Sequence, residues 1–145
     1  MNFEKTKIRE AIIETIFQIN FLDVSLEELE DTFKKISDKK NISEIHKKLG
    51  LEYIEDMNES IEEIDKSIKR YLKNWKFERI GNIEKSILRL SIYEMYYRDD
   101  IPFKVSIDES LKILEKYGDD KSIKFVNGIL DSFAKENIVG ADNDE

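Results

Sequence analysis

Apolar residues recur at alternating three- and four-residue spacings along almost the whole chain, which is the pattern of amphipathic helices. One proline and five glycines in 145 residues leave few of the turn signals that separate β-strands. The spacing predicts helices over about 5–20, 51–75, 83–95 and 122–135, with shorter helices after residues 25 and 106. The polar stretch 37–48 is expected to be partly loop. The sequence therefore predicts an all-α fold of about six to seven helices.

Two of these helices carry recognisable start signals. Ser25 and Glu28 have the spacing of a capping box, in which each side chain accepts a hydrogen bond from the other residue's backbone N–H. Ser106 and Glu109 repeat this spacing and predict the start of a helix that ends near Gly118. Gly118 is expected to form a left-handed helix cap.

The composition is that of one globular domain. Hydrophobic residues make up 40% of the chain, enough for a core although 39% of the residues are charged. The absence of cysteine excludes disulfides, thiolate metal sites and a cysteine nucleophile. There is no apolar run of the roughly 20 residues that span a bilayer, and no signal-peptide core. We expect a cytoplasmic protein with a single helical domain over 1–139 and a disordered acidic tail at 140–145.

The net charge of −8 comes from one part of the chain. Seven of the 32 acidic residues lie between Glu52 and Asp65, a segment without Lys or Arg, and the remaining acids nearly balance the 24 basic residues. A basic run follows at once. It consists of Lys66, Lys69, Arg70, Lys73, Lys76 and Arg79, opposed only by Glu78. A basic face is therefore compatible with the negative total.

No motif supports catalysis or metal binding. His46 is the only histidine and lies in a polar stretch. The acidic segment 52–65 lacks the Glu-x-x-His element of di-iron sites and the glycine turn of a calcium loop, which favours a solvated helix face. Nucleotide-binding and nucleophile-elbow motifs are also missing. We expect no catalytic residues, metal or cofactor, and a binding protein in place of an enzyme.

Four motifs in the second half of the chain occur together. They are Glu84 and Lys85, Leu-Arg-x-x-x-x-Glu at 88–94, Asp-x-Pro-x-x-Val-x-Ile at 100–107, and Lys-Phe-x-Asn-Gly-x-Leu-Asp at 124–131. Their order and spacing resemble those of the NusB family across residues 82–134. The first helix, with Arg9, Glu10, Ala11 and Phe17, also fits the opening helix of that family.

The resemblance implies a NusB-like fold of two small helical subdomains. It also implies a transcription antitermination factor that binds the boxA element of nascent ribosomal RNA together with the ribosomal protein NusE. The complex then promotes read-through by RNA polymerase. An RNA-modifying enzyme is disfavoured, because NusB-like domains fused to methyltransferases continue into a long catalytic domain.

The resemblance places an RNA surface on two regions of the chain. Recognition of single-stranded RNA needs cations for the phosphates and flat side chains for the bases. The candidates are Lys5, Lys7 and Arg9 in the first helix and Tyr117, Lys121, Lys124, Phe125 and Asn127 around the start of the last. Free N–H groups at that helix start are expected to favour phosphate. Core packing is the alternative for Phe125, simple solvation for Lys124 and a structural amide for Asn127.

The resemblance also implies a protein-binding surface that includes Phe17, Glu84 and Arg98. The alternative for Phe17 is core packing. For Glu84 it is a favourable interaction with the dipole of its own helix, since an acid in the first turn is stabilising.

Two departures from the family pattern keep a second hypothesis open. The family's dense amino-terminal cation run is diluted here by Glu4 and Glu10, so RNA affinity is expected to be low and sensitive to salt. Lys121 stands where the family often has an acid, which restores one cation. The competing hypothesis is a helical protein–protein interaction module with weak or no RNA binding. The sequence leaves monomer and homodimer open.

Overall fold

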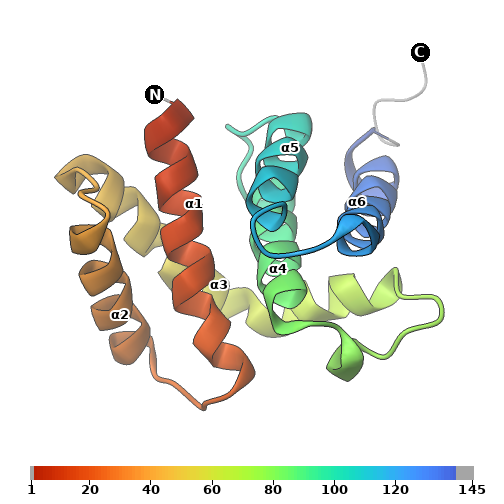
Figure 1. The fold of residues 1–145 in the computed structure, drawn as a ribbon, viewed down its shortest axis with the longest axis horizontal. Helices are drawn as coiled ribbons and strands as arrows, with labels where there is room; N and C mark the ends of the chain where they lie inside the picture. The colour runs from red at the N-terminus through yellow and green to blue at the C-terminus, as the bar shows by residue number, and fades with distance from the viewer. Residues whose placement is uncertain (1, 140–145) are drawn as a thin grey trace. The chain divides into compact units, whose positions relative to one another are not determined.

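The computed structural model describes residues 2–139, and this part of the chain is helical without β-strands. The elements are α1 (Asn2–Ile16), η1 (Phe17–Asn20), α2 (Leu26–Lys39), α3 (Glu44–Arg70), η2 (Phe77–Arg79), α4 (Asn82–Tyr97), α5 (Phe103–Leu114), α6 (Asp120–Ala134) and η3 (Lys135–Val139) (Figure 1). The predicted all-α class and number of helices are confirmed. The tail predicted at 140–145 lies outside the described residues.

The chain folds as two compact units that divide within α3. The first unit ends at Ser60 and the second begins at Ile61. This division matches the two helical subdomains that the family resemblance implies.

In the first unit, α1 and α2 run antiparallel and pack through their apolar faces (Figure 1). Ile12 and Phe33 are both fully buried. The predicted capping box at the start of α2 is confirmed. The Glu28 N–H donates to Ser25 Oγ at 3.1 Å, and the Ser25 N–H donates to Glu28 Oε1 at 2.9 Å. The bond from the Ser25 N–H is the largest cause of a lowered pKa of Glu28.

The long helix α3 begins earlier than predicted. It starts at Glu44, so the partial loop expected in the polar stretch 37–48 is confirmed but is confined to a short turn at residues 40–43. In that turn Asn41 has a φ of 58°, a left-handed conformation that asparagine tolerates. Gly50 is buried in α3, where a Cβ atom would lie 2.1 Å from the Phe33 ring. The glycine lets the Phe33 ring of α2 lie against the backbone of α3.

A carboxyl pair between these helices makes the first unit sensitive to pH. Burial raises the pKa of Glu30 on α2, and the hydrogen bond and charge of Glu55 on α3 raise it further. The folded chain therefore binds this proton more tightly than the unfolded chain. The resulting stabilisation is present below the ordinary titration range of a glutamate, and it is lost as the pH rises through the raised pKa.

Replacing Glu30 with glutamine should raise the melting temperature at pH 7 by about 1–2 °C, because it removes a repulsion of the size typical of surface charges. It should also flatten the gain in stability as the pH falls from 7 toward the ordinary titration range of a glutamate. Thermal unfolding followed by circular dichroism measures both effects. Glu59→Gln, the same change at an exposed position of α3, is the control. Identical pH profiles for Glu30→Gln and the unaltered chain would contradict the assignment.

In the second unit α4 is the buried helix, with α5 and α6 packed against it. All eleven residues from Lys85 to Met95 are buried. Because such a helix has no solvated face, its polar side chains need partners inside the protein. Arg89 forms two hydrogen bonds with Asp65 on α3, from Nε to Oδ1 at 2.8 Å and from Nη2 to Oδ2 at 3.0 Å. Glu94 Oε1 accepts a hydrogen bond from Ser106 Oγ at 2.7 Å.

The contact with Glu94 explains why the second predicted capping box is wrong. Helix α5 begins at Phe103, directly after Pro102, so Ser106 lies inside the helix and is fully buried. Its hydroxyl serves the buried carboxylate of α4 and does not cap a helix. Gly118 does not have the positive φ expected of it, because α5 ends at Leu114 and turns follow.

Candidate nucleic-acid interface

The predicted RNA residues of the second unit gather around α6. Lys121, Lys124 and Phe125 have i, i+3 and i+4 spacing and therefore share one face of the helix. Both lysines are exposed and Phe125 is half-buried. Asn127 is exposed on the same helix, and Tyr117, in the connection from α5, is 53% exposed. This region offers solvent both cations and aromatic surface.

The start of α6 differs from the expectation in one respect. Its Ser122 N–H is not free, because it donates to Asp119 Oδ1 at 2.9 Å. This hydrogen bond is the largest cause of a lowered pKa of Asp119. Asp120 adds a second acid in the first turn. The helix start is thus capped at Ser122 and acidic, so the charges of Lys121 and Lys124 are its main attraction for phosphate.

The three predicted cations of α1 lie in different environments. Lys5 is exposed. Lys7 is half-buried, and its Nζ donates to the backbone oxygen of Lys40 at 3.3 Å. Arg9 is only 5% exposed. Exposure to solvent therefore favours Lys5 as a phosphate contact and does not favour Arg9.

Glu84, a predicted partner residue, connects the starts of α4 and α6. Its Oε2 accepts a hydrogen bond from Ser122 Oγ at 2.6 Å. Gly81 makes room for this carboxylate, since a Cβ atom there would lie 2.1 Å from Glu84 Oε1. Glu84 thus has a tertiary role in addition to its place in the first turn of α4. Arg98, at the other end of α4, is half-buried, and its Nε lies 3.7 Å from Asp100 Oδ1.

Phe17 belongs to a small apolar patch that the sequence pattern does not identify in full. Its ring is half-buried in η1 and lies 5.3 Å from the ring of Phe21. Phe21 and Leu22 are 62% and 61% exposed. The sequence gives one indication of this patch: the apolar residues Phe21 and Leu22 directly follow the helix predicted over 5–20. We call Phe17, Phe21 and Leu22 the η1 patch.

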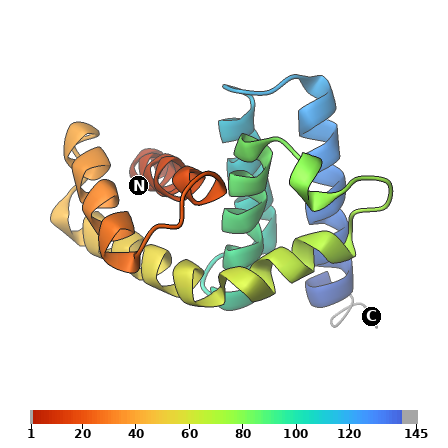
Figure 2. The same cartoon turned by 90° about the horizontal axis from the view of Figure 1, so that it is seen from below.

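The sequence pattern also fails to predict that Trp75 is exposed. Its spacing places Trp75 on the buried apolar face of a helix predicted to end at residue 75. The helix ends at Arg70, and Trp75 lies in the connection to α4, 60% exposed. Its ring centroid is 6.2 Å from that of Phe125, in an edge contact. Figure 2 shows this connection passing beside α6. Trp75 therefore adds a second ring to the predicted RNA region.

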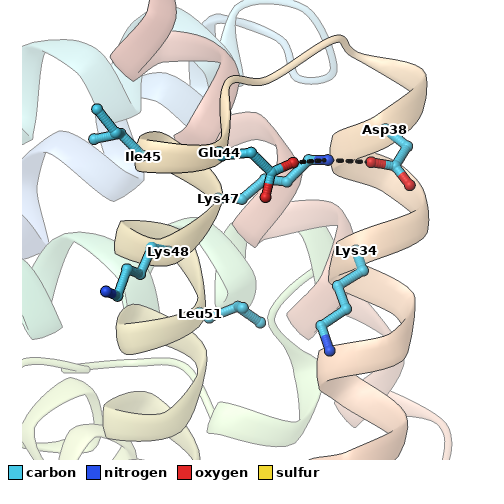
Figure 3. A pocket seen from close by; sticks show the side chains of 7 residues that line it. All are labelled: Lys34, Asp38, Glu44, Ile45, Lys47, Lys48 and Leu51. Atoms are coloured by element: carbon cyan, nitrogen blue, oxygen red, sulfur yellow. Dashed lines mark hydrogen bonds and ion pairs between the residues drawn. The ribbon is translucent and has the colours of Figure 1, made fainter.

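A surface hollow in the first unit lies between α2 and α3 (Figure 3). Its lining consists of Lys34, Asp38, Glu44, Ile45, Lys47, Lys48 and Leu51. Lys47 forms ion pairs with Asp38 and Glu44, which raise its pKa. The charge of Lys47 is thus balanced by carboxylates that line the same hollow.

The described residues contain no cluster of three or more histidine and carboxylate side chains that could hold a metal ion. In the acidic segment Asp65 pairs with Arg89, while the other six acids are exposed. Within the same part of the chain, no helix combines the length and the apolar character needed to cross a membrane.

Comparison with known proteins gives the family. The sequence model of the NusB family matches residues 6–135. The chain belongs to the NusB family. It is 37% identical over 131 residues to the transcription antitermination protein NusB of Pseudothermotoga lettingae, covering 90% of this chain and 91% of that protein. The crystal structure of T. maritima NusB superposes with a TM-score of 0.80 at 36% identity, with 90% of each chain covered.

A third likeness concerns the fold alone. A chain in the crystal structure of the antitermination factors NusB and NusE in complex with dsRNA superposes with a TM-score of 0.82 at 23% identity, covering 94% of this chain and 99% of that chain. The predicted NusB-like fold is confirmed. The relatives are named transcription antitermination proteins, so the predicted class of function, transcription antitermination, is confirmed as well.

Proposed function

We propose that this member of the NusB family acts in the cytoplasm by binding boxA-like single-stranded RNA of nascent transcripts, together with a ribosomal protein of the NusE type. The observation that carries the proposal is the exposed face of α6. Lys121 and Lys124 lie there beside the half-buried ring of Phe125. Ammonium groups next to an aromatic ring supply the two interactions that unpaired RNA requires, attraction to phosphate and stacking of bases.

The partner part of the proposal rests on exposed apolar surface. The η1 patch exposes most of the Phe21 and Leu22 side chains, and such exposed rings and aliphatic chains are typical of protein contacts. A NusB in a solved complex with NusE and dsRNA has the same fold. We infer that the η1 patch contributes apolar contacts to the ribosomal protein, and that Glu84 and Arg98 contribute polar ones. The resulting complex would act on RNA polymerase as an antitermination assembly.

A second candidate function, a protein-interaction module without RNA binding, is favoured by the environment of α1. Arg9 is 5% exposed and Lys7 is engaged with the backbone of α2's carboxyl end. Fewer cations are therefore directed to solvent than in a dense basic amino terminus. This alternative predicts that the ribosomal partner binds, and that RNA binds neither the free protein nor the pair.

The ribosomal partner should raise the affinity for RNA by about tenfold or more, within the usual range of coupling between two sites. The reason is that RNA held by two adjacent proteins meets the second surface at high effective concentration. Fluorescence anisotropy of a labelled boxA-like RNA, with and without purified NusE, measures the change. RNA must tighten the protein pair by the same factor, which calorimetry checks independently.

A variant of Glu84 separates its two roles. Glu84→Gln keeps an oxygen that can accept the Ser122 hydroxyl and removes the charge, whereas Glu84→Lys would also disturb the start of α6. We expect Glu84→Gln to weaken the protein pair and to leave the RNA affinity of the free protein within about twofold. Binding of NusE without any RNA binding would replace the proposal with the interaction module.

A further inference from the structure

Trp75 is exposed although tryptophan is among the most buried residues on average. Its side chain is 60% exposed, and its described ring contact is the edge contact with Phe125 at 6.2 Å. An indole placed this way covers little of the protein's own core. It does provide a flat surface next to a ring that the proposed function assigns to RNA.

The segment that carries Trp75 is held in place by an interaction of cations with one aromatic ring. Phe77 follows Trp75 by two residues and begins η2. The Nζ atoms of Lys69 and Lys85 lie 5.3 and 4.9 Å from the centroid of the Phe77 ring, and Arg89 Cζ lies 5.5 Å from it. Each such contact is attractive. The connection between α3 and α4 is thereby attached to both helices, which places Trp75 at a defined position beside α6.

Gly128 gives an independent indication that something approaches this face from outside. It follows Lys124 by four residues and Phe125 by three, so it continues the same stripe of α6. It is exposed, and a Cβ atom there would meet nothing within 4 Å. Glycine in an exposed helix interior is less stable than alanine. Since no packing within the protein requires it, the missing side chain leaves room for a ligand.

From these observations we infer that Trp75 and Phe125 form a two-ring platform on which unpaired RNA bases stack, with the RNA backbone passing over Gly128. The inference rests on the proposed function and extends its site to the α3–α4 connection. Lys73 and Lys76, both exposed, flank Trp75 and supply cations on the loop side. Lys121 and Lys124 supply them on the α6 side. Stacking on aromatic rings between cations is a general mode of binding single strands.

Trp75 is the only tryptophan of the chain, so its fluorescence reports directly on stacking. Titration with an unlabelled boxA-like RNA should quench this fluorescence with the same midpoint as the anisotropy of the labelled RNA. Inorganic polyphosphate, which has the charge of RNA and no bases, should bind the lysines without comparable quenching. Trp75→Ala should weaken RNA binding by about 5- to 150-fold, the range expected for one stacked base, while Trp75→Phe should remain within about threefold of the unaltered chain.

Substitutions of Gly128 distinguish a role in RNA binding from a role in the stability of the fold. Gly128→Ala should raise the melting temperature and yet weaken RNA binding, and Gly128→Gln should weaken it further. Quenching by NusE alone, with none by RNA, would overturn the inference in favour of a protein contact. RNA binding with normal affinity by Trp75→Ala, without quenching in the unaltered chain, would overturn it and leave the proposed function standing. Absence of any RNA binding by the unaltered chain would overturn both.

Discussion

Replacing Arg89 with alanine should lower the free energy of unfolding of the second unit by about 3 kcal/mol, the lower end of the range for breaking a buried ion pair. The Arg89 side chain is 6% exposed and that of Asp65 is 20% exposed. Without the guanidinium, the carboxylate of Asp65 would be deprived of two hydrogen bonds while still largely shielded from water. The variant would also leave a cavity against α4 and remove one of the three cations at the Phe77 ring.

Urea denaturation followed by circular dichroism measures this decrease. Arg89→Lys should recover only part of the stability, because an ammonium cannot form the paired hydrogen bonds of the guanidinium fork. A double-mutant cycle with Asp65→Ala isolates the energy of the pair from the effect of the cavity. The role assigned to the pair would be wrong if Arg89→Ala cost less than about 1 kcal/mol, the value typical of exposed ion pairs.

The motifs that carry the family resemblance have two different physical roles, and the Arg89–Asp65 pair is an example of the first. In the motif at 88–94, Arg89 and Glu94 are buried and hold α4 to α3 and α5. In the motif at 124–131, Lys124 and Gly128 face solvent. Both kinds of motif look alike in a sequence. Burial separates the residues that maintain the fold from those available to a ligand.

Most of the helices could be predicted from the sequence because apolar spacing reports directly on the buried face. The errors lie where a distant contact overrides a local signal. The capping-box spacing of Ser106 and Glu109 is a local signal, but the buried carboxylate of Glu94 binds the Ser106 hydroxyl, and α5 begins earlier. Likewise, the spacing of Trp75 continues that of α3, although the helix ends at Arg70.

The part of the candidate site that lies in or beside a family motif could be predicted from the sequence. Lys124 and Phe125 follow from the family motif at 124–131, whereas Lys121 departs from the family pattern, and the structure places all three on one face of α6. Trp75 and the η1 patch could not be predicted, because exposure of an apolar residue depends on where its helix ends, and helix ends are the least certain part of a sequence prediction. The burial of Arg9 could not be predicted either, because a charged residue near the start of a helix is normally expected to be exposed.

The cations of α6 should account for a large part of the RNA affinity. Replacing both Lys121 and Lys124 with glutamate should weaken binding of a boxA-like RNA by about 10- to 100-fold at roughly 0.1 M salt, because the two acids repel phosphate where the two cations attracted it. The slope of log affinity against log salt should fall by about 1.4, or about 0.7 for each phosphate of a single strand that is no longer neutralised. Anisotropy titrations at several salt concentrations measure both quantities.

The fold should survive this change, since Lys121 and Lys124 are exposed and acids near a helix start are favourable to the helix dipole. The matched control is Lys35→Glu with Lys48→Glu, which alters the net charge equally at exposed positions of α2 and α3 outside the proposed surface. If the two double variants weakened RNA binding equally, the effect would come from net charge and the α6 surface would be misplaced. A decrease in affinity confined to the α6 variant, with an unchanged melting temperature, would mean that RNA contacts these two lysines, because a long-range effect of charge would act on both variants alike.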